Sequence, residues 1–318
     1  MKKLLFTILC SLICLLPQTA FAWDDVGHKV VSRIAWEKMT PQARQKAIEL
    51  LLLAPEDSGL AWLVPPDSRS WATRQMEFFE IASTWPDIAR DEKSPLRRAK
   101  YHHGNWHYDD FFWKQVNGQP VDATEFHADS VNAVERLLFL QKALADQSLP
   151  ANERAIYLSW VLHLMGDIHQ PLHCSSRVTE TEPKGDQGGN LFYLEPKKEP
   201  KDAANRELRL SLHWYWDTIL RYAYPRHDEC DADYINVIAA KIMARYPMSQ
   251  NQAELKPDQF DEWAQEGFKI AKTEVYPQTL KRDEMPSEKY QQNAIKISEQ
   301  RMALAGYRMA QLLNKLFG

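Results

Sequence analysis

The sequence predicts a mainly α-helical protein that folds as a single compact domain. Glycine is scarce, with 11 residues in a chain of 318, and the 18 prolines fall mainly between periodic stretches. Over those stretches, apolar residues recur at alternating spacings of three and four, which is the period of an amphipathic helix. No internal repeat, low-complexity tract or domain boundary interrupts the pattern, so residues 23–318 are expected to form one domain.

The first 22 residues predict an export signal that is removed. Lys2 and Lys3 precede an apolar run from Leu4 to Leu16, and Ala20-Phe21-Ala22 has the small-x-small pattern that a signal peptidase accepts. The alternative is a membrane anchor, but the apolar run is shorter than the ~20 residues that span a bilayer. We therefore expect Trp23 to begin the mature protein, which would be periplasmic or secreted and free of the membrane.

Helical periodicity and end signals locate the expected helices. Thr40-Pro41 is typical of a helix start, with threonine as the N-cap and proline in the first turn. Helices are expected at 26–37, from Pro41 through Leu53, at 69–82, 124–146, 150–170, 206–222, 231–246 and 257–273, and along a C-terminal stretch that includes Met302 to Leu316.

One long polar loop is expected at 175–204, where loop-forming residues are concentrated. Within it only the stretch "NLFYL" predicts a short strand. The fold should therefore contain at most a short hairpin.

The charge balance excludes one class of function. The net charge is −4 for the whole chain and becomes −6 when Lys2 and Lys3 leave with the signal. An acidic, exported protein without a long basic block is not a coat that binds nucleic acid through surface charge. If its substrate is anionic, something other than lysine and arginine must attract it.

Cys174 and Cys230 are the two cysteines that remain in the mature chain. An even pair in an oxidising compartment predicts a disulfide between them. The alternative is that they ligate a metal, but no CxxC spacing supports it.

The strongest local signal is a repeated pairing of histidine with aspartate. In "HLMGDIHQPLHC", His163 and Asp167 are four residues apart, which places both on one face of a helix, and "LHWYWD" repeats the spacing with His213 and Asp217. Imidazole and carboxylate are both good zinc ligands, so two such pairs indicate a metal site. The alternative for each pair is a hydrogen-bonded couple that stabilises its helix.

Trp23 is a further candidate ligand if it becomes the N-terminus. A free α-amino group has a pKa of about 7.7–8.0, so a metal can displace its proton at neutral pH. The amine and the carbonyl oxygen of Trp23 could then chelate a metal, and His28 follows just over one helical turn later. The alternative is that Trp23 is an aromatic residue with no ligand role.

Taken in order, these motifs resemble the three-zinc, single-strand-specific nucleases of the S1/P1 type. The resemblance extends over essentially the whole mature chain and rests on the order and spacing of several motifs, since no single one would suffice. They are "WDDVGHKVV", "IASTWPDIAR", "NWHYDD", "HLMGDIHQPLH", "GDQGGNLF" and "LHWYWD". The resemblance implies the helical fold shared by zinc phospholipases C and these nucleases.

The resemblance also implies which residues bind three zinc ions. Trp23 and His28 would hold one ion and share the bridging Asp167 with a second, which also takes Asp87, His107 and His163, while His173, His213 and Asp217 would hold the third. Asp167 and Asp87 would thus be the catalytic carboxylates. Among the histidines of "YHHGNWHYDD", His107 is chosen for its aromatic-flanked setting, and His169 is expected to be structural or outside the ligand shell.

Substrate contacts are predicted at three positions. Gly189 and Asn190 in "GDQGGN" can bring backbone and an amide close to a phosphate or a base, and Tyr108 can stack on a base. Asp109 and Asp110 are candidates for an accessory base. The alternative for Gly189 and Asn190 is a plain surface turn. The alternative for Tyr108 is packing in the core.

The implied activity is zinc-dependent hydrolysis of single-stranded DNA and RNA to 5′-nucleotides, together with 3′-nucleotidase activity, without a stable protein partner. The nearest rival is a zinc phospholipase C, but that family places its first histidine further from its terminal tryptophan and ends its last ligand pair with glutamate, where this chain has Asp217. A second rival is a zinc-sequestering helical protein without turnover.

Overall fold

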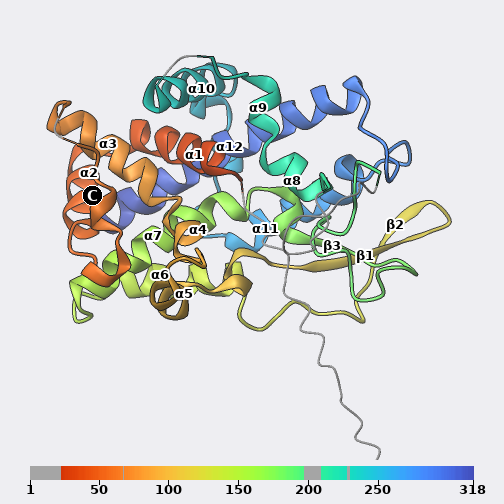
Figure 1. The fold of residues 1–318 in the computed structure, drawn as a ribbon, viewed down its shortest axis with the longest axis horizontal. Helices are drawn as coiled ribbons and strands as arrows, with labels where there is room; N and C mark the ends of the chain where they lie inside the picture. Colours follow the sequence, from red (N-terminus) through yellow and green to blue (C-terminus); the bar gives the residue numbers. More distant parts are fainter. Residues whose placement is uncertain (1–22, 67, 197–208, 228–229) are drawn as a thin grey trace, which may run out of the picture.

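The computed structural model describes residues 23–66, 68–196, 209–227 and 230–318 and is mainly helical (Figure 1). The predicted signal peptide at 1–22 lies outside the described residues. So do residues 197–208, which include the end of the predicted polar loop and the start of the predicted helix at 206–222.

The α-helices, in chain order, are α1 (Asp25–Lys38), α2 (Pro41–Leu51), α3 (Trp71–Ala82), α4 (Trp85–Ala89), α5 (Pro95–Tyr101), α6 (Ala133–Ala145), α7 (Ala151–Asp167), α8 (Leu212–Asp217), α9 (Ile219–Ala223), α10 (Asp231–Arg245), α11 (Phe260–Ile270) and α12 (Glu288–Phe317). The shorter helical turns are η1 (Glu56–Ser58), η2 (Ala61–Leu63), η3 (Gly104–His107), η4 (Pro171–Cys174), η5 (Met248–Gln250), η6 (Gln252–Glu254) and η7 (Ala271–Val275). Among the described helices, none is both long and apolar enough to cross a membrane.

Side-chain caps explain where several of these helices begin. Thr40 accepts a hydrogen bond from the backbone N–H of Ala43 and starts α2, as predicted. The helix predicted at 124–146 starts only at Ala133, because Asn132 caps it by accepting from the N–H of Glu135 at 2.9 Å. The helix predicted at 206–222 is divided into α8 and α9, because Thr218 departs from helical geometry.

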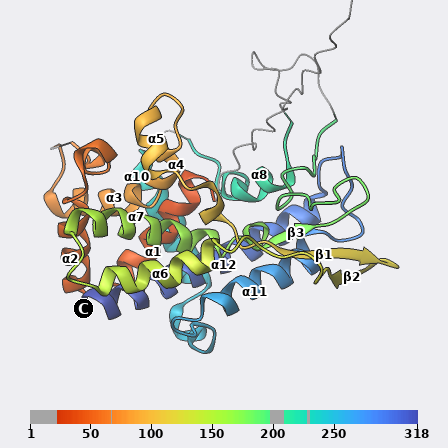
Figure 2. The same cartoon turned by 90° about the horizontal axis from the view of Figure 1, so that it is seen from below.

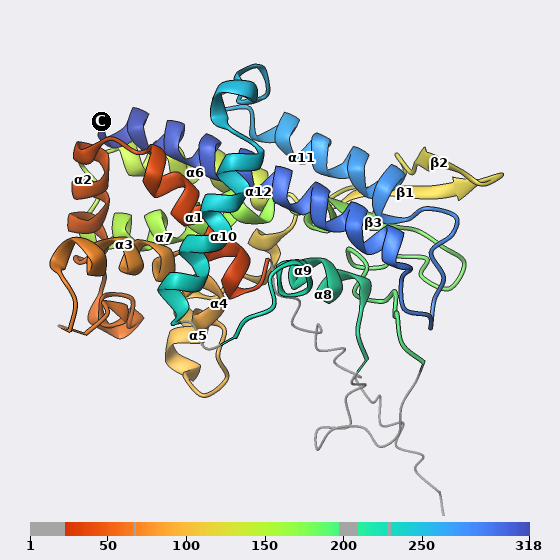
Figure 3. The same cartoon turned by 90° about the horizontal axis from the view of Figure 1, so that it is seen from above.

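Helix α1 lies at the centre of the helical layers. It packs against α12, α10, α3 and α7, and Figures 1 and 3 show it between these helices. The approach of α12 to α1 depends on Gly306, because a Cβ at this position would lie 2.5 Å from Cγ2 of Ile34. Bare backbone at Gly306 therefore lets the two helices come close, which fixes the position of His28 on α1.

A small sheet lies at one end of the molecule (Figure 2). Strands β1 (Phe111–Val116) and β2 (Gln119–Asp122) form an antiparallel hairpin, and β1 also pairs in parallel with β3 (Ser175–Arg177), so the order is β2-β1-β3. The hairpin is not at "NLFYL", where Tyr193 makes only an isolated bridge with Ser211. The β1–β3 pairing joins the segment after His107 to the segment after His173.

The predicted disulfide between Cys174 and Cys230 is not formed in this structure. Cys174 is buried, and its thiol lies 3.4 Å from the carbonyl oxygen of Ile168. Cys230 is exposed, and its thiol lies 3.1 Å from a carboxylate oxygen of Asp233. One cysteine is buried and the other is exposed, so the presence of two cysteines in the mature chain did not indicate a disulfide.

We predict that a protein beginning at Trp23 contains two free thiols of unequal reactivity. A thiol reagent such as Ellman's should modify Cys230 rapidly in the folded protein and should reach Cys174 only after unfolding, because Cys174 is fully buried. A Cys230→Ser variant, which should show no rapid reaction, is the control. Absence of any thiol in the unfolded, unreduced protein would contradict this prediction.

Candidate metal centre

Helix α7 carries the central pair of the site. His163 and Asp167 are fully buried one turn apart, and Nε2 of His163 lies 3.4 Å from Oδ2 of Asp167. Nδ1 of His163 is 2.8 Å from the carbonyl oxygen of Ser83, an acceptor that places the imidazole proton on Nδ1. The lone pair of Nε2 is therefore directed into the site, as in metal-binding histidines.

Two histidines from other elements converge on Asp167. Nε2 of His28, from α1, lies 3.3 Å from Oδ1 of Asp167, and Nδ1 of His107, from η3, lies 3.1 Å from Oδ2. Nδ1 of His107 is also 3.0 Å from Nε2 of His163. Each oxygen of Asp167 thus faces at least one imidazole, which is the arrangement a bridging carboxylate requires.

Asp87, on α4, completes this first cluster. Its Oδ1 lies 3.8 Å from Nε2 of His163 and 3.0 Å from Nη2 of Arg90. Ligand atoms of His28, Asp87 and His163 lie within 4.8 Å of one another, as do those of His107, His163 and Asp167. The first cluster, which consists of His28, Asp87, His107, His163 and Asp167, therefore offers two overlapping metal positions.

A second cluster is formed by His173, His213 and Asp217, whose ligand atoms also lie within 4.8 Å of one another. Nε2 of His213 is 3.3 Å from Oδ2 of Asp217, and Nε2 of His173 is 4.0 Å from Oδ1. Gln170 donates to Oδ1 of Asp217 at 2.7 Å. The amide thus orients the carboxylate while the two imidazoles approach it.

Backbone carbonyls orient the histidines of the second cluster and connect it to the first. Nδ1 of His173 lies 2.7 Å from the carbonyl oxygen of His107, and Nδ1 of His213 lies 2.7 Å from that of Gly188. His107 therefore supplies its ring to one cluster and its carbonyl to the other. A displacement of η3 would disturb both.

The donor atoms in these clusters fit divalent metal ions. Among the described residues, Nε2 of His28, Oδ1 of Asp167 and Oδ2 of Asp217 face into the clusters and are buried without a hydrogen-bond partner. Protein interiors rarely leave such groups unsatisfied unless an ion or water completes them. A metal would accept these lone pairs, and mixed nitrogen and oxygen donors suit zinc.

Burial sets the protonation states that metal binding requires. Burial, and next the neighbouring imidazole of His163, lower the pKa of His28 well below its usual value, and burial does the same for His107. These imidazoles are therefore neutral at pH 7 and keep a lone pair. Burial raises the pKa values of Asp167 and Asp217 well above normal, so both carboxylates need a nearby positive charge to ionise.

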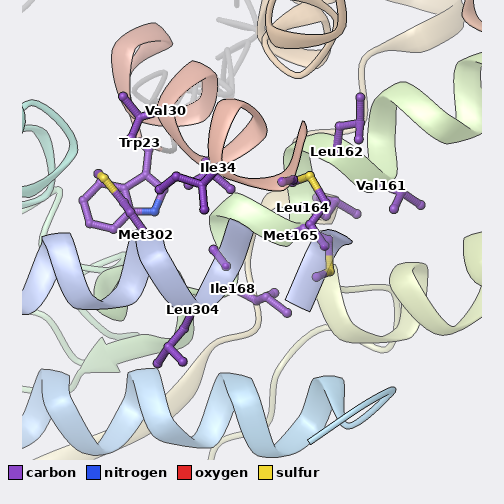
Figure 4. Close-up of a cluster of buried hydrophobic side chains, with 14 of the residues drawn as sticks. Trp23, Val30, Ile34, Val161, Leu162, Leu164, Met165, Ile168, Met302 and Leu304 are labelled. Carbon is purple, nitrogen blue, oxygen red and sulfur yellow. The ribbon is translucent and has the colours of Figure 1, made fainter. Parts of the chain in front are cut away.

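Trp23 lies against this centre. Its side chain is fully buried, and Figure 4 shows the indole beside Met302 of α12. The next residue, Asp24, caps α1 and donates its backbone N–H to the carbonyl oxygen of Asp217 at 3.1 Å. The backbone at Trp23 is thus held between α1, which carries His28, and α8, which carries Asp217.

Comparison with known proteins decides the family. Residues 23–318 match the S1/P1 nuclease family. The chain belongs to this family. It is also similar to Endonuclease 2 of Arabidopsis thaliana, with 27% identity over 314 residues that cover 93% of this chain and 91% of the plant protein. The chain is therefore a nuclease, a hydrolase of phosphodiester bonds.

The structure brings eight predicted ligand residues of the nuclease into the two clusters and places Trp23 next to them. His169, within the same motif, is elsewhere: its Nδ1 lies 2.8 Å from the carbonyl oxygen of Met165, and its Nε2 lies 2.8 Å from Nη1 of Arg308. His103 instead stacks on Trp106. Among the described residues, neither His169 nor His103 belongs to a group that could hold a metal ion.

The "GDQGGN" loop supports the candidate metal ligand His213. Gly188 and Gly189 have φ values of +61° and +82°, which favour glycine, and the carbonyl oxygens of these two residues accept from the ring and the backbone N–H of His213. Asn190 is 7% exposed and donates its side-chain amide to the carbonyl oxygen of Gln187. The loop thus builds the His213 position, and substrate contact by Gly189 and Asn190 remains a prediction.

Tyr108 connects the centre to a small pocket. Its ring stacks on His173, with ring centres 4.7 Å apart and planes 12° apart. The pocket, of about 120 Å³, is lined by Asn105, Tyr108, Asp110, Phe112, His127, Ala128, Asp129 and Asn132. Burial raises the pKa of Asp110 to about 7, so this carboxyl group of the pocket is partly protonated at neutral pH.

The sequence interpretation missed residues that shape the site without binding metal. Gln170, which orients Asp217, and Ser83, whose carbonyl orients His163, lie inside quoted motifs. Gly166 was also missed: a Cβ there would lie 2.7 Å from Nδ1 of His28. A glycine in the middle of an otherwise helical run was the available signal, since it is unfavourable there without a packing reason.

We predict that Gly166→Ala weakens zinc binding roughly 10–100-fold, the range found when groups that orient metal ligands are changed. The added methyl would force His28 away from Asp167, although alanine favours the helix itself. Competition with a chromogenic chelator measures the affinity. Gly267→Ala is the matched control, because its Cβ would meet Cys174 at an ordinary 3.4 Å. Equal zinc affinities for the two variants would contradict the role of Gly166.

Proposed function

We propose that this nuclease is a zinc-dependent endonuclease that hydrolyses single-stranded DNA and RNA to 5′-nucleotides and also acts as a 3′-nucleotidase. The observation that carries the proposal is the convergence of buried imidazoles and carboxylates in two clusters beside the Tyr108 pocket. Family membership favours this activity over the two rivals, a phospholipase C and a protein that only sequesters zinc.

Three zinc ions would be held by these residues. His28 and Asp167 would hold one together with the amine and carbonyl of Trp23; Asp87, His107, His163 and the shared Asp167 would hold the second; and the second cluster would hold the third. Bound zinc supplies Lewis acidity, because it lowers the pKa of water to about 7 and stabilises charge on phosphate oxygens.

The residues of the chain would orient and attract the substrate. Three divalent ions outweigh the charge of Asp87, Asp167 and Asp217, so the site would be positive although the protein is acidic. Gln170 would keep Asp217 turned towards its cluster, and Arg90 would keep Asp87 from rotating away. A phosphodiester would thus be drawn to the buried centre rather than to a basic surface.

The pocket beside Tyr108 supports the proposed preference for single strands. A pocket of about 120 Å³ admits a base only after the base has left its stack. A paired base must also break its pairing, which costs a few kcal/mol. Tyr108, held against His173, would offer a stacking surface worth about 1–3 kcal/mol to an unpaired base.

Export with cleavage before Trp23 is part of the proposal. The small-x-small pattern at Ala20-Phe21-Ala22 supports it, as does a family match that begins at Trp23. Only cleavage at this bond leaves a free amine on Trp23. The mature nuclease would then act in the periplasm or outside the cell.

We predict that removing zinc abolishes hydrolysis and destabilises the fold. A chelator should stop the release of 5′-nucleotides from denatured DNA, and zinc should restore it. Because metal at 1,000 times its Kd stabilises a folded state by about 4 kcal/mol, the metal-free protein should melt at a lower temperature. Release of nucleotides at an undiminished rate from a protein shown to be zinc-free would refute the metal requirement.

We further predict that one extra residue before Trp23 removes one zinc ion, because the amine becomes an amide that donates poorly to metals. Zinc content is measured by atomic absorption for the protein beginning at Trp23 and for the extended form. The control carries the extra residue after Gly318 instead. If the two extended forms bind equal amounts of zinc, the amine of Trp23 is not a ligand.

A further inference from the structure

A row of aromatic rings leads away from the metal centre. Trp160, on α7, meets His107 with ring centres 5.3 Å apart and meets Trp106 with centres 4.8 Å apart, both nearly edge to face. His103 stacks on Trp106 with centres 4.0 Å apart and planes 16° apart. The orientation of these rings is therefore fixed by a residue that also packs against a metal ligand.

Arg136, on α6, continues the row to an exposed ring. Its guanidinium carbon lies 5.3 Å from the ring centre of Trp106 and 4.8 Å from that of Phe139. Phe139 is 41% exposed, and the edge-to-face contact with Tyr157, at 5.9 Å, supports it. A large apolar ring thus lies at the surface with contacts from two neighbouring side chains, and its exposed part can stack with a planar group.

This row is continuous with the Tyr108 pocket. Asn132, the N-cap of α6, lines that pocket, and Arg136 and Phe139 follow it four and seven residues later, on the same side of the helix. Successive turns of a helix rise by about 5.4 Å. An extended strand leaving the pocket along α6 would therefore meet a polar group, a guanidinium and a ring at regular intervals.

The guanidinium of Arg136 can bind a phosphate group of a polynucleotide at short range. Arg136 is paired with Glu135 through Nε and Nη2. A guanidinium has five N–H donors, so this ion pair leaves donors with which Arg136 can bind a phosphate oxygen. Because the protein as a whole is acidic, attraction here must come from short-range stacking and this one cation.

We propose that His103, Trp106, Arg136 and Phe139, here called the α6 stacking surface, bind the nucleotides that flank the scissile linkage in a single-stranded polynucleotide. The inference rests on the proposed nuclease activity and adds to it a path for the strand beyond the Tyr108 pocket. Unpaired bases can stack on these side chains, whereas the bases of a duplex are already stacked on one another.

The experiment compares a thymidine oligonucleotide long enough to pass the pocket with a 3′-nucleotide that ends inside it. Phe139→Ala should raise the KM for the oligonucleotide roughly 5-fold or more relative to the KM for the nucleotide, as expected for one lost stack of about 1–3 kcal/mol. Arg136→Gln should act in the same direction. Leu138→Ala, which removes a neighbouring side chain that is 40% exposed on α6, is the matched control.

A second substrate isolates the stacking. On an oligonucleotide of the same length that keeps bases only at the cleaved step, the zinc-loaded protein and its Phe139→Ala variant should have equal KM values, because no flanking base remains to stack. The inference is overturned if Phe139→Ala leaves the KM for the full oligonucleotide unchanged. It is also overturned if Phe139→Ala raises the KM values for both oligonucleotides by the same factor, or if Leu138→Ala raises the KM for the full oligonucleotide as much as Phe139→Ala does.

The experiment distinguishes failure of the proposed nuclease activity from failure of the α6 stacking surface. If the zinc-loaded protein hydrolyses neither substrate, the proposed activity is wrong, and binding then decides the inference alone. Fluorescence anisotropy with a labelled thymidine oligonucleotide should show weaker binding by Phe139→Ala than by Leu138→Ala. Equal affinities would reject the α6 stacking surface.

Discussion

The structure depends on one constraint, which is that carboxylates and imidazoles are gathered where water cannot solvate them. Asp167 is fully buried, each of its oxygens faces an imidazole, and burial raises its pKa well above normal. An ionised carboxylate is costly in such surroundings unless a positive charge compensates it. Metal binding and the folding of this region are therefore expected to be coupled.

The candidate ligands orient one another through the backbone. Nδ1 of His163 lies against the carbonyl oxygen of Ser83. In the same way, Nδ1 of His173 and of His213 lie against the carbonyl oxygens of His107 and Gly188, respectively. Ser83 lies four residues before Asp87, a candidate ligand, and His107 is itself a candidate ligand. Close helix packing at Gly166 and Gly306 then fixes where α1 presents His28. Each of these segments therefore helps to position another segment of the site.

Much of the fold and of the site could be predicted from local patterns. Caps and three-four periodicity located most helices, and the Asn132 cap shows why the start of α6 was placed too early. The position of the hairpin β1–β2 was not predicted, although Asn117 and Gly118, both with positive φ, form the Asn-Gly turn typical of hairpins. The disulfide could not be inferred, because a count of cysteines carries no distance between them.

The sequence by itself determined which residues can share a helix face, and hence the pairs His163–Asp167 and His213–Asp217, since that spacing is a local property of the backbone. It determined the family through the order of its motifs. Only the tertiary structure decided which oxygen of Asp167 meets which imidazole, and that a glycine on α7 makes room for His28. These contacts join segments far apart in the chain, and their geometry is set by helix packing, which no local pattern encodes.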